Sequence, residues 1–326
     1  MAKMTTVTNR ELEVPAGKVV PGGIYENPLS DRGFKKLLSS ASSLTNFLNG
    51  VMHLDKEHEI KKLKFKTKKI SYVAADGSGA EEETWSFDIR AQTRDGRAID
   101  VEVQNLKHEF FKDRVLIYGS ALLLKAKAEL DKARSDADKK KMESRDPPEL
   151  TKEEKKERRR QVYEIPDTVS VWICNFLLPS GSKKVWDCWM LYSENELENG
   201  SLLPITDRIK YIFVQLPNFN KSVEELESAQ DQWIYILKHA FASSKEIEIK
   251  NEAVTEALER IKAKVNEKPK ESLSMITRKE RECTVASIEH WAELRGEARG
   301  RAEAAAEIEA LRARNAELEA MLAQKG

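Results

Sequence analysis

Two alternating strands joined by a short turn, in residues 85–104, constrain this chain more than any other stretch of its 326 residues. Apolar and polar side chains alternate on both sides of the turn at 94–96, which is typical of strands with one buried and one solvated face. We therefore expect a β-hairpin here. Its apolar side chains are Trp85, Phe87, Ile89 and Ala91 in the first strand, and Ile99, Val101 and Val103 in the second.

The length of the turn decides which residues of the hairpin face each other. A two-residue loop at Asp95-Gly96 would place Asp88 opposite Val103 and put the two apolar sets on opposite faces of the sheet. A three-residue loop, with Gly96 in the left-handed conformation after a type I turn, places Asp88 opposite Glu102. The Cβ atoms of such a pair lie roughly 4.5 to 5.5 Å apart, and two carboxylates there repel each other. A divalent cation prefers oxygen ligands and removes the repulsion, so this register favours a metal site.

The spacing of these polar residues resembles a known nuclease pattern. Thirteen residues separate Asp88 from Glu102-Val103-Gln104, and this resembles the PD-(D/E)XK nuclease pattern in the variant where Gln replaces Lys. Further motifs resemble the recombination-promoting nuclease and transposase branch of that superfamily, in order from about residue 27 to about residue 250. These motifs are Asp31-Arg32-Gly33-Phe34-Lys35, Phe47-Leu48-Asn49, and Phe110-Phe111 followed by Arg114 and Tyr118.

The resemblance implies an α/β fold, a restriction-endonuclease-like mixed sheet flanked by helices, and hydrolysis of DNA that depends on Mg²⁺ or Mn²⁺. On this resemblance Asp88 and Glu102 are catalytic metal ligands, and Gln104 orients the attacking water or the phosphate. Asp31 contributes to the metal site from the first helix, directly or through water. Capping that helix is the alternative role for Asp31.

Three other side chains are candidates for contacts with DNA. Lys35 lies one helical turn after Asp31, so it can pair with that carboxylate or with a phosphate. Arg114 and Tyr118 share a helix face, which suits a phosphate contact and a stacked base or sugar. Outside a nuclease, the same two residues would be an exposed arginine and a core tyrosine.

The hairpin also has a plainer interpretation. Asp88 and Glu102 would then be surface carboxylates on a solvated sheet face, where Arg90 and Asp100 form an ordinary cross-strand ion pair. In that case the chain is a nucleic-acid-binding or protein-interaction module with the same fold and with weak or no catalysis. The presence of Asp88, Glu102 and Gln104 together favours the nuclease.

Composition limits the partners that we expect. Lys plus Arg and Asp plus Glu number 55 each, so any affinity for DNA must come from a local basic patch. The longest apolar run, residues 169–178, is too short to span a bilayer, and residues 1–26 lack the apolar core of a signal peptide. Three cysteines without a C-x-x-C pair indicate reduced thiols in a cytoplasmic protein.

Residues 1–26 are predicted to be a flexible lead-in, and residues 27–268 the nuclease-like domain. An apolar stripe predicts one helix that starts at Ser30 or Asp31 and continues towards Met52. Periodicity and turn residues predict further strands at 63–73, 169–178, 184–192 and 210–216, and further helices at 108–130, 223–241 and 247–265.

Residues 125–160 form a charged helical insertion with 14 Lys or Arg and 10 Asp or Glu. One interpretation is a solvated pair of helices broken at Pro147-Pro148. The other is that residues 155–160 grip phosphates.

The tail, residues 269–326, is predicted to be helical. Its apolar residues recur at spacings of three and four, as in the seam of a short coiled coil through which two copies would form a homodimer. A single amphipathic helix is the alternative. The seam residues are Ile308, Leu311, Asn315, Leu318 and Leu322.

Overall fold

The computed structural model of this chain describes residues 23–54, 56–66, 69–73, 82–107, 110–142, 151–178, 182–200, 203–262 and 309. The predicted coiled coil lies outside the described residues, apart from residue 309, so the homodimer stays a prediction. The described residues 23–106 and 115–262 belong to one compact unit and 107–114 to a second. Each unit is described by itself.

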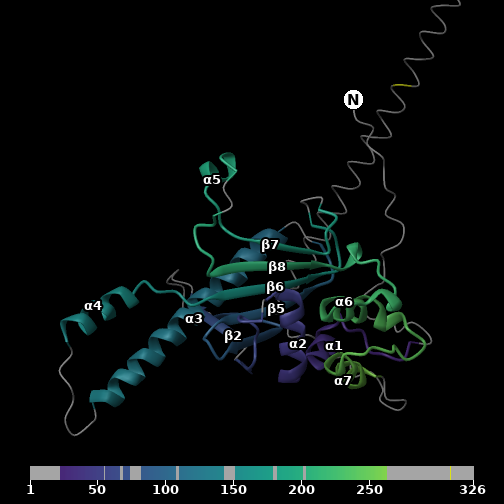
Figure 1. The fold of residues 1–326 in the computed structure, drawn as a ribbon, viewed down its shortest axis with the longest axis horizontal. Helices are drawn as coiled ribbons and strands as arrows, with labels where there is room; N and C mark the ends of the chain where they lie inside the picture. Colours follow the sequence, from purple (N-terminus) through teal and green to yellow (C-terminus); the bar gives the residue numbers. More distant parts are fainter. Residues whose placement is uncertain are drawn as a thin grey trace, which may run out of the picture. The chain divides into compact units, whose positions relative to one another are not determined.

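A six-stranded mixed sheet lies at the centre of the larger unit (Figure 1). Counted across the sheet, the third, fourth and fifth strands run parallel to one another. Every other pair of neighbouring strands is antiparallel. Two more strands, β2 (Lys69–Val73) and β3 (Glu82–Ser86), form a separate antiparallel pair. In spatial order the strands of the large sheet are β1 (Leu63–Phe65), β4 (Ile89–Thr93), β5 (Ala98–Gln104), β6 (Thr168–Cys174), β8 (Ile209–Gln215) and β7 (Trp186–Trp189).

Helices pack on both faces of this sheet. One face is covered by α1 (Asp31–Leu37), α2 (Ala41–Met52), α6 (Ala229–His239) and α7 (Glu252–Ile261). The other face meets α3 (Phe111–Met142), which together with α4 (Lys152–Gln161) connects the parallel strands β5 and β6. The shorter helices are α5 (Glu194–Glu198) and the 3₁₀ turns Leu216–Asn218, Val223–Glu225 and Ala240–Ala242.

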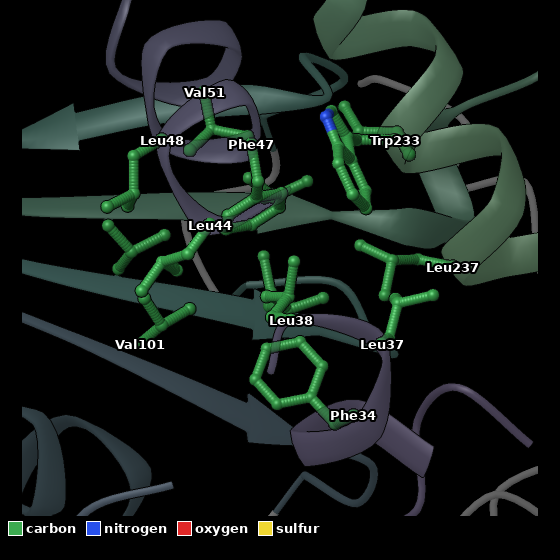
Figure 2. Close-up of a cluster of buried hydrophobic side chains, with 14 of the residues drawn as sticks. Phe34, Leu37, Leu38, Leu44, Phe47, Leu48, Val51, Val101, Trp233 and Leu237 are labelled. Carbon is green, nitrogen blue, oxygen red and sulfur yellow. The ribbon is translucent and has the colours of Figure 1, made fainter. Parts of the chain in front are cut away.

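Figure 2 shows the apolar core between α1, α2, α6 and the sheet. The Phe47 ring meets the Trp233 ring edge-on, with their centroids 5.7 Å apart, and the Trp233 indole donates to Asn46 Oδ1 at 2.8 Å. Full burial of side chains of this size contributes roughly 1.5–3 kcal/mol each. Four apolar side chains of the hairpin face this core as predicted, Ile89, Ala91, Ile99 and Val101, and Val103 packs against it.

The hairpin has the three-residue loop that the sequence predicts. Gly96 has a φ of 96°, and its N–H donates to the Thr93 carbonyl at 3.1 Å. Arg90 pairs with Asp100 and Ala91 with Ile99. The left-handed conformation at Gly96 requires glycine, because a Cβ would be strained there.

The prediction of one unbroken first strand is wrong. The chain leaves the ladder at Phe87 and Asp88, between β3 and β4. The Phe87 ring meets the Tyr118 ring of α3, with centroids 5.5 Å apart. Phe87 therefore faces α3 rather than the side of Ile89, opposite to the prediction.

The predicted first helix is two helices. α1 ends at Leu37 and α2 begins at Ala41, because the Ser40 hydroxyl accepts from the Ser43 N–H at 3.1 Å and caps a new helix. The glycine of the first motif has a packing role in α1. A Cβ at Gly33 would lie 1.9 Å from the Asn27 carbonyl oxygen, so the chain can approach this closely only at glycine.

Other predicted elements are present with different limits. Strands β6, β7 and β8 match three predicted strands with shorter or shifted ends, whereas the predicted strand 63–73 divides into β1 and β2 of separate sheets. Helices α6 and α7 begin later than predicted, because Ser228 and Asn251 cap them. Residues 24–26, predicted to be flexible, hydrogen-bond to Ser243 and Ile261.

Candidate active site

Asp88 and Glu102 lie side by side, and each carboxylate accepts a hydrogen bond from a backbone N–H at or next to the other residue. The Asp88 N–H donates to Glu102 Oε1 at 2.9 Å, and the Val103 N–H donates to Asp88 Oδ2 at 3.0 Å. These contacts explain the break before β4, because the Asp88 N–H bonds to a carboxylate where a strand ladder would offer a carbonyl. Glu102 is 2% exposed and the Asp88 side chain 24%, so only Asp88 reaches solvent substantially.

The polar face of the hairpin is buried under α3, so the solvated face in the plainer interpretation is wrong. Arg90 is 1% exposed and Asp100 is fully buried. Arg90 pairs with Glu129 of α3 at 2.9 Å, and Lys66 pairs with the same carboxylate at 3.0 Å. Burial alone raises the pKa of Glu129, but the hydrogen bonds from Arg90 and Lys66 hold it below its usual value.

Asp100 forms a second buried polar contact, two residues before Glu102 on the same face of β5. The Ser170 hydroxyl donates to Asp100 Oδ2 at 3.0 Å, and the Trp172 indole donates to the Ser170 oxygen at 2.8 Å. Burial raises the pKa of Asp100 to about 8, although the Ser170 hydrogen bond and the Arg90 charge lower it. The nearby Asp88 carboxylate raises it further.

Helix α1 brings two predicted residues to these carboxylates. Lys35 hydrogen-bonds to Asp31 one turn earlier, and its Nζ lies 3.9 Å from Asp88 Oδ1. Ser30, not Asp31, caps the helix, because the Ser30 hydroxyl accepts from the Gly33 N–H at 3.0 Å. The Asp31 carboxylate is thus directed to Lys35, and Lys35 joins Asp31 to Asp88.

Asn105 is a positioning residue that the sequence did not indicate. Its Nδ2 donates to the Leu29 carbonyl at 2.6 Å, and the Leu29 N–H donates to Asn27 Oδ1 at 2.9 Å. These bonds fix the loop before α1 to the end of β5. In the sequence, the only indication of this role was the position of Asn105 directly after Gln104.

Gln104 lies at the end of β5 on the same face as Glu102. Its side chain is half-buried, and its Nε2 donates to the Leu106 carbonyl at 3.0 Å. A glutamine amide carries two N–H donors and an acceptor oxygen, so this contact uses one part of its hydrogen-bonding capacity.

Tyr118 and Arg114 have different surroundings. Tyr118 is 1% exposed, and its ring meets the rings of Phe87 and Trp172 edge-on. This is the packing of a core tyrosine rather than of a ring that stacks on a base. Arg114 lies one turn earlier in α3, in the smaller unit, so its contact with DNA stays a prediction.

Two features are absent from the described residues. No group of three or more His, Cys, Asp or Glu side chains in this part of the chain is placed to hold a metal ion. None of the described helices is both long enough and apolar enough to cross a membrane.

Comparison with known proteins identifies one family, and its fold class agrees with the structure. Residues 28–141 and 148–287 match the family described as PD-(D/E)XK nuclease family transposase. No curated protein and no solved structure matches the chain. The family match covers most of the chain, and the mixed sheet with helices on both faces is the α/β fold expected of such a nuclease. This chain therefore belongs to the PD-(D/E)XK nuclease transposase family.

Proposed function

We propose that this protein is a DNA endonuclease that hydrolyses phosphodiester bonds with Mg²⁺ or Mn²⁺. The observation that carries the proposal is the pair of adjacent carboxylates, Asp88 and Glu102, of which Glu102 accepts from the Asp88 N–H and Asp88 accepts from the Val103 N–H. A link to recombination or mobile elements comes from the family description alone. A cytoplasmic location and a nuclease domain at 27–268 with a separate tail belong to the same proposal.

The residues of this site fit a hard divalent cation. Asp88 and Glu102 offer oxygen ligands, which Mg²⁺ and Mn²⁺ prefer, and their orientation is fixed by backbone hydrogen bonds. A bound cation acidifies a water and neutralises charge on the phosphate. Two protein carboxylates suffice for Mg²⁺, because it commonly keeps several waters and substrate oxygens as its other ligands.

The neighbouring side chains have separate roles in this proposal. Gln104 hydrogen-bonds to the attacking water or the phosphate, since its amide offers both donors and an acceptor. Lys35 is close enough to Asp88 to exchange its carboxylate partners for a phosphate when DNA binds. Asp31 holds Lys35 in this position or contributes to the metal site through water. Arg114 contacts the DNA backbone.

The metal site can be tested without knowing the DNA sequence that is cut. Melting curves of the wild type, Asp88→Asn and Glu102→Gln are compared in EDTA and in millimolar Mn²⁺. We expect Mn²⁺ to stabilise the wild type by about 2–3 kcal/mol if its concentration exceeds Kd about 100-fold. Each variant should lose most of this shift and all cleavage. In EDTA each variant should melt at or above the wild-type temperature, because the two carboxylates repel each other.

A control comes from the turn of the same hairpin. Asp95 is an exposed carboxylate, 3.8 Å from Arg97, so Asp95→Asn should keep the full metal-dependent shift. If the wild type shows no shift, or if Asp88→Asn shifts as much as Asp95→Asn, these carboxylates do not bind the metal.

A second function is favoured by the Lys35 contact. An ammonium 3.9 Å from Asp88 already offsets part of the negative charge that would attract a cation, and Gln104 lacks the charge of a lysine. On this alternative the protein binds nucleic acid or another protein and cuts weakly or not at all. A plasmid-nicking assay with Mg²⁺ and with EDTA separates the two functions, since only the endonuclease nicks in a metal-dependent way.

A further inference from the structure

The charged insertion forms a helical hairpin whose second helix has a fixed orientation. Arg158 of α4 pairs with Asp138 of α3 at 2.7 Å. Arg134 of α3 pairs with Glu164 at 2.6 Å and donates to the Gln161 carbonyl at 3.3 Å. These contacts show that the side of α4 that carries Arg158, and the end of the helix at Gln161, face α3.

The charges of α4 are sorted around its axis. At about 3.6 residues per turn, five cations fall within roughly 140° of the circumference, on the side away from Arg158 and Gln161. Glu153, Glu154 and Glu157 lie on the remaining part of the helix. No residue of α4 is buried. The cations, which we name the outer basic face, are Lys152, Lys155, Lys156, Arg159 and Arg160.

This sorting is unfavourable for an isolated helix. Like charges four residues apart repel, and the outer basic face has three such pairs, Lys152 with Lys156, Lys155 with Arg159, and Lys156 with Arg160. A helix that is only solvated gains more from opposite charges at this spacing. Among the described residues, the cations of this face have one carboxylate within 4.0 Å, Glu157, which lies 3.9 Å from Arg160.

We propose that the outer basic face of α4 binds the phosphate backbone of duplex DNA away from the cleavage site. The proposal rests on the proposed endonuclease function, because it names a second contact for the same substrate. The chain has equal numbers of acidic and basic residues, so a local patch must supply the attraction to DNA. Helix α4 is about 15 Å long, and a duplex of that length carries roughly nine phosphate charges.

Two observations favour DNA over an acidic protein as the partner. The outer basic face is a band of cations with little apolar surface, whereas protein interfaces centre on buried apolar and aromatic anchors. Tyr163, just beyond α4, is 88% exposed, and tyrosine hydroxyls commonly contact phosphate and sugar.

The length of α3 sets how far this contact lies from the site. Tyr118 packs against Phe87, next to Asp88, and Asp138 beside α4 lies twenty positions further along α3. That length is about 30 Å at 1.5 Å per residue, or roughly nine base pairs of duplex. A duplex too short to reach α4 should therefore bind without its contribution.

The test compares full-length chains that bind a short and a long duplex in EDTA over a range of salt concentrations. Lys155→Gln with Arg159→Gln should reduce the salt slope on the long duplex by about two units, since each phosphate contact contributes about 0.9. Affinity for the long duplex should fall about tenfold or more at low salt, and affinity for the short duplex should change little. The charge-preserving pair Lys155→Arg with Arg159→Lys should bind as the wild type does.

The matched control removes two exposed cations elsewhere, Lys245 and Lys250, which lie between α6 and α7. Lys245→Gln with Lys250→Gln should leave the slope unchanged. An unchanged slope in Lys155→Gln with Arg159→Gln, in a wild type that binds and cuts DNA, would overturn the role of α4 alone. If the wild type binds neither duplex, the proposed DNA substrate fails together with it.

Discussion

The two faces of the central sheet are both covered by helices, but their chemistry differs. On one face, α2 and α6 bring apolar side chains such as Phe47 and Trp233 against the sheet. On the other, α3 brings Tyr118 and Glu129 against a face that carries the buried Arg90. The first face is stabilised by the area it removes from water, whereas the second must provide a partner for each buried charge. The candidate active site lies on the second face, where polar groups are already positioned by hydrogen bonds.

The largest effect is expected on the apolar face. Phe47→Ala removes a fully buried ring that packs on Trp233, and should reduce the free energy of unfolding by about 3–5 kcal/mol. Urea unfolding measures this change. Phe65→Ala is the control, because Phe65 is 43% exposed on the edge strand β1, and it should cost far less. Equal costs would show that α2 and the sheet do not form the main core.

The polar face should be sensitive to the loss of one charge. Glu129→Gln removes the carboxylate that lies 2.9 Å from the buried Arg90, and we expect a loss of about 2–3 kcal/mol, below the full cost of breaking a buried pair because Glu129 is partly exposed. Asp131→Asn, two residues further along α3 and in an exposed pair with Lys127, should change the free energy of unfolding by less than about 1 kcal/mol. If both variants cost the same in urea unfolding, the polar face does not depend on charge pairing.

The effect that is smallest over a single pH unit, but the most specific, concerns Asp100. The pKa of Asp100 is about 8 in the folded protein, above its usual value of 3.8. Proton binding by Asp100 therefore stabilises the folded protein fully below pH 4. This stabilisation is lost as the pH rises towards 8. Asp100→Asn cannot titrate. The stability of Asp100→Asn relative to the wild type should therefore rise by about 1 kcal/mol per pH unit between pH 5 and pH 8.

This comparison is made by urea unfolding in EDTA at each pH, with Asp95→Asn as the control in the exposed turn. Asp95→Asn should follow the wild-type curve across this range. Parallel curves for Asp100→Asn and the wild type would mean that Asp100 is ionised in the folded protein throughout.

The apolar face could be predicted from the sequence because only one register of the hairpin places its apolar side chains on the same side of the sheet. Alternation fixed the side of the sheet that Ile89 and Ile99 face, and Gly96 fixed the register. The split of the first helix was missed because Leu44 and Phe47 continue an apolar stripe across the break, while the local hydrogen bond of Ser40 ends it.

The polar face could be predicted only in part. An alternating strand looks the same whether its polar side meets water or a helix, so the burial of Arg90 and Asp100 was missed. A signal was present in α3, where Glu129 continues the spacing of the buried residues Tyr118, Leu122 and Ala126. A charged residue in such a stripe indicates a buried partner. The facing carboxylates followed from register alone, but the Lys35 contact needed the fold.

The two backbone hydrogen bonds at the site make it possible to follow the state of both carboxylates by NMR. The amide protons of Asp88 and Val103 point directly at the carboxylates that we propose as metal ligands. Any event that withdraws electron density from those oxygens, protonation or cation binding alike, weakens them as acceptors and shifts the amide resonances. Two peaks in a nitrogen-edited NMR spectrum would thus follow occupancy of the site directly, in the intact chain, without a substrate and without a substitution.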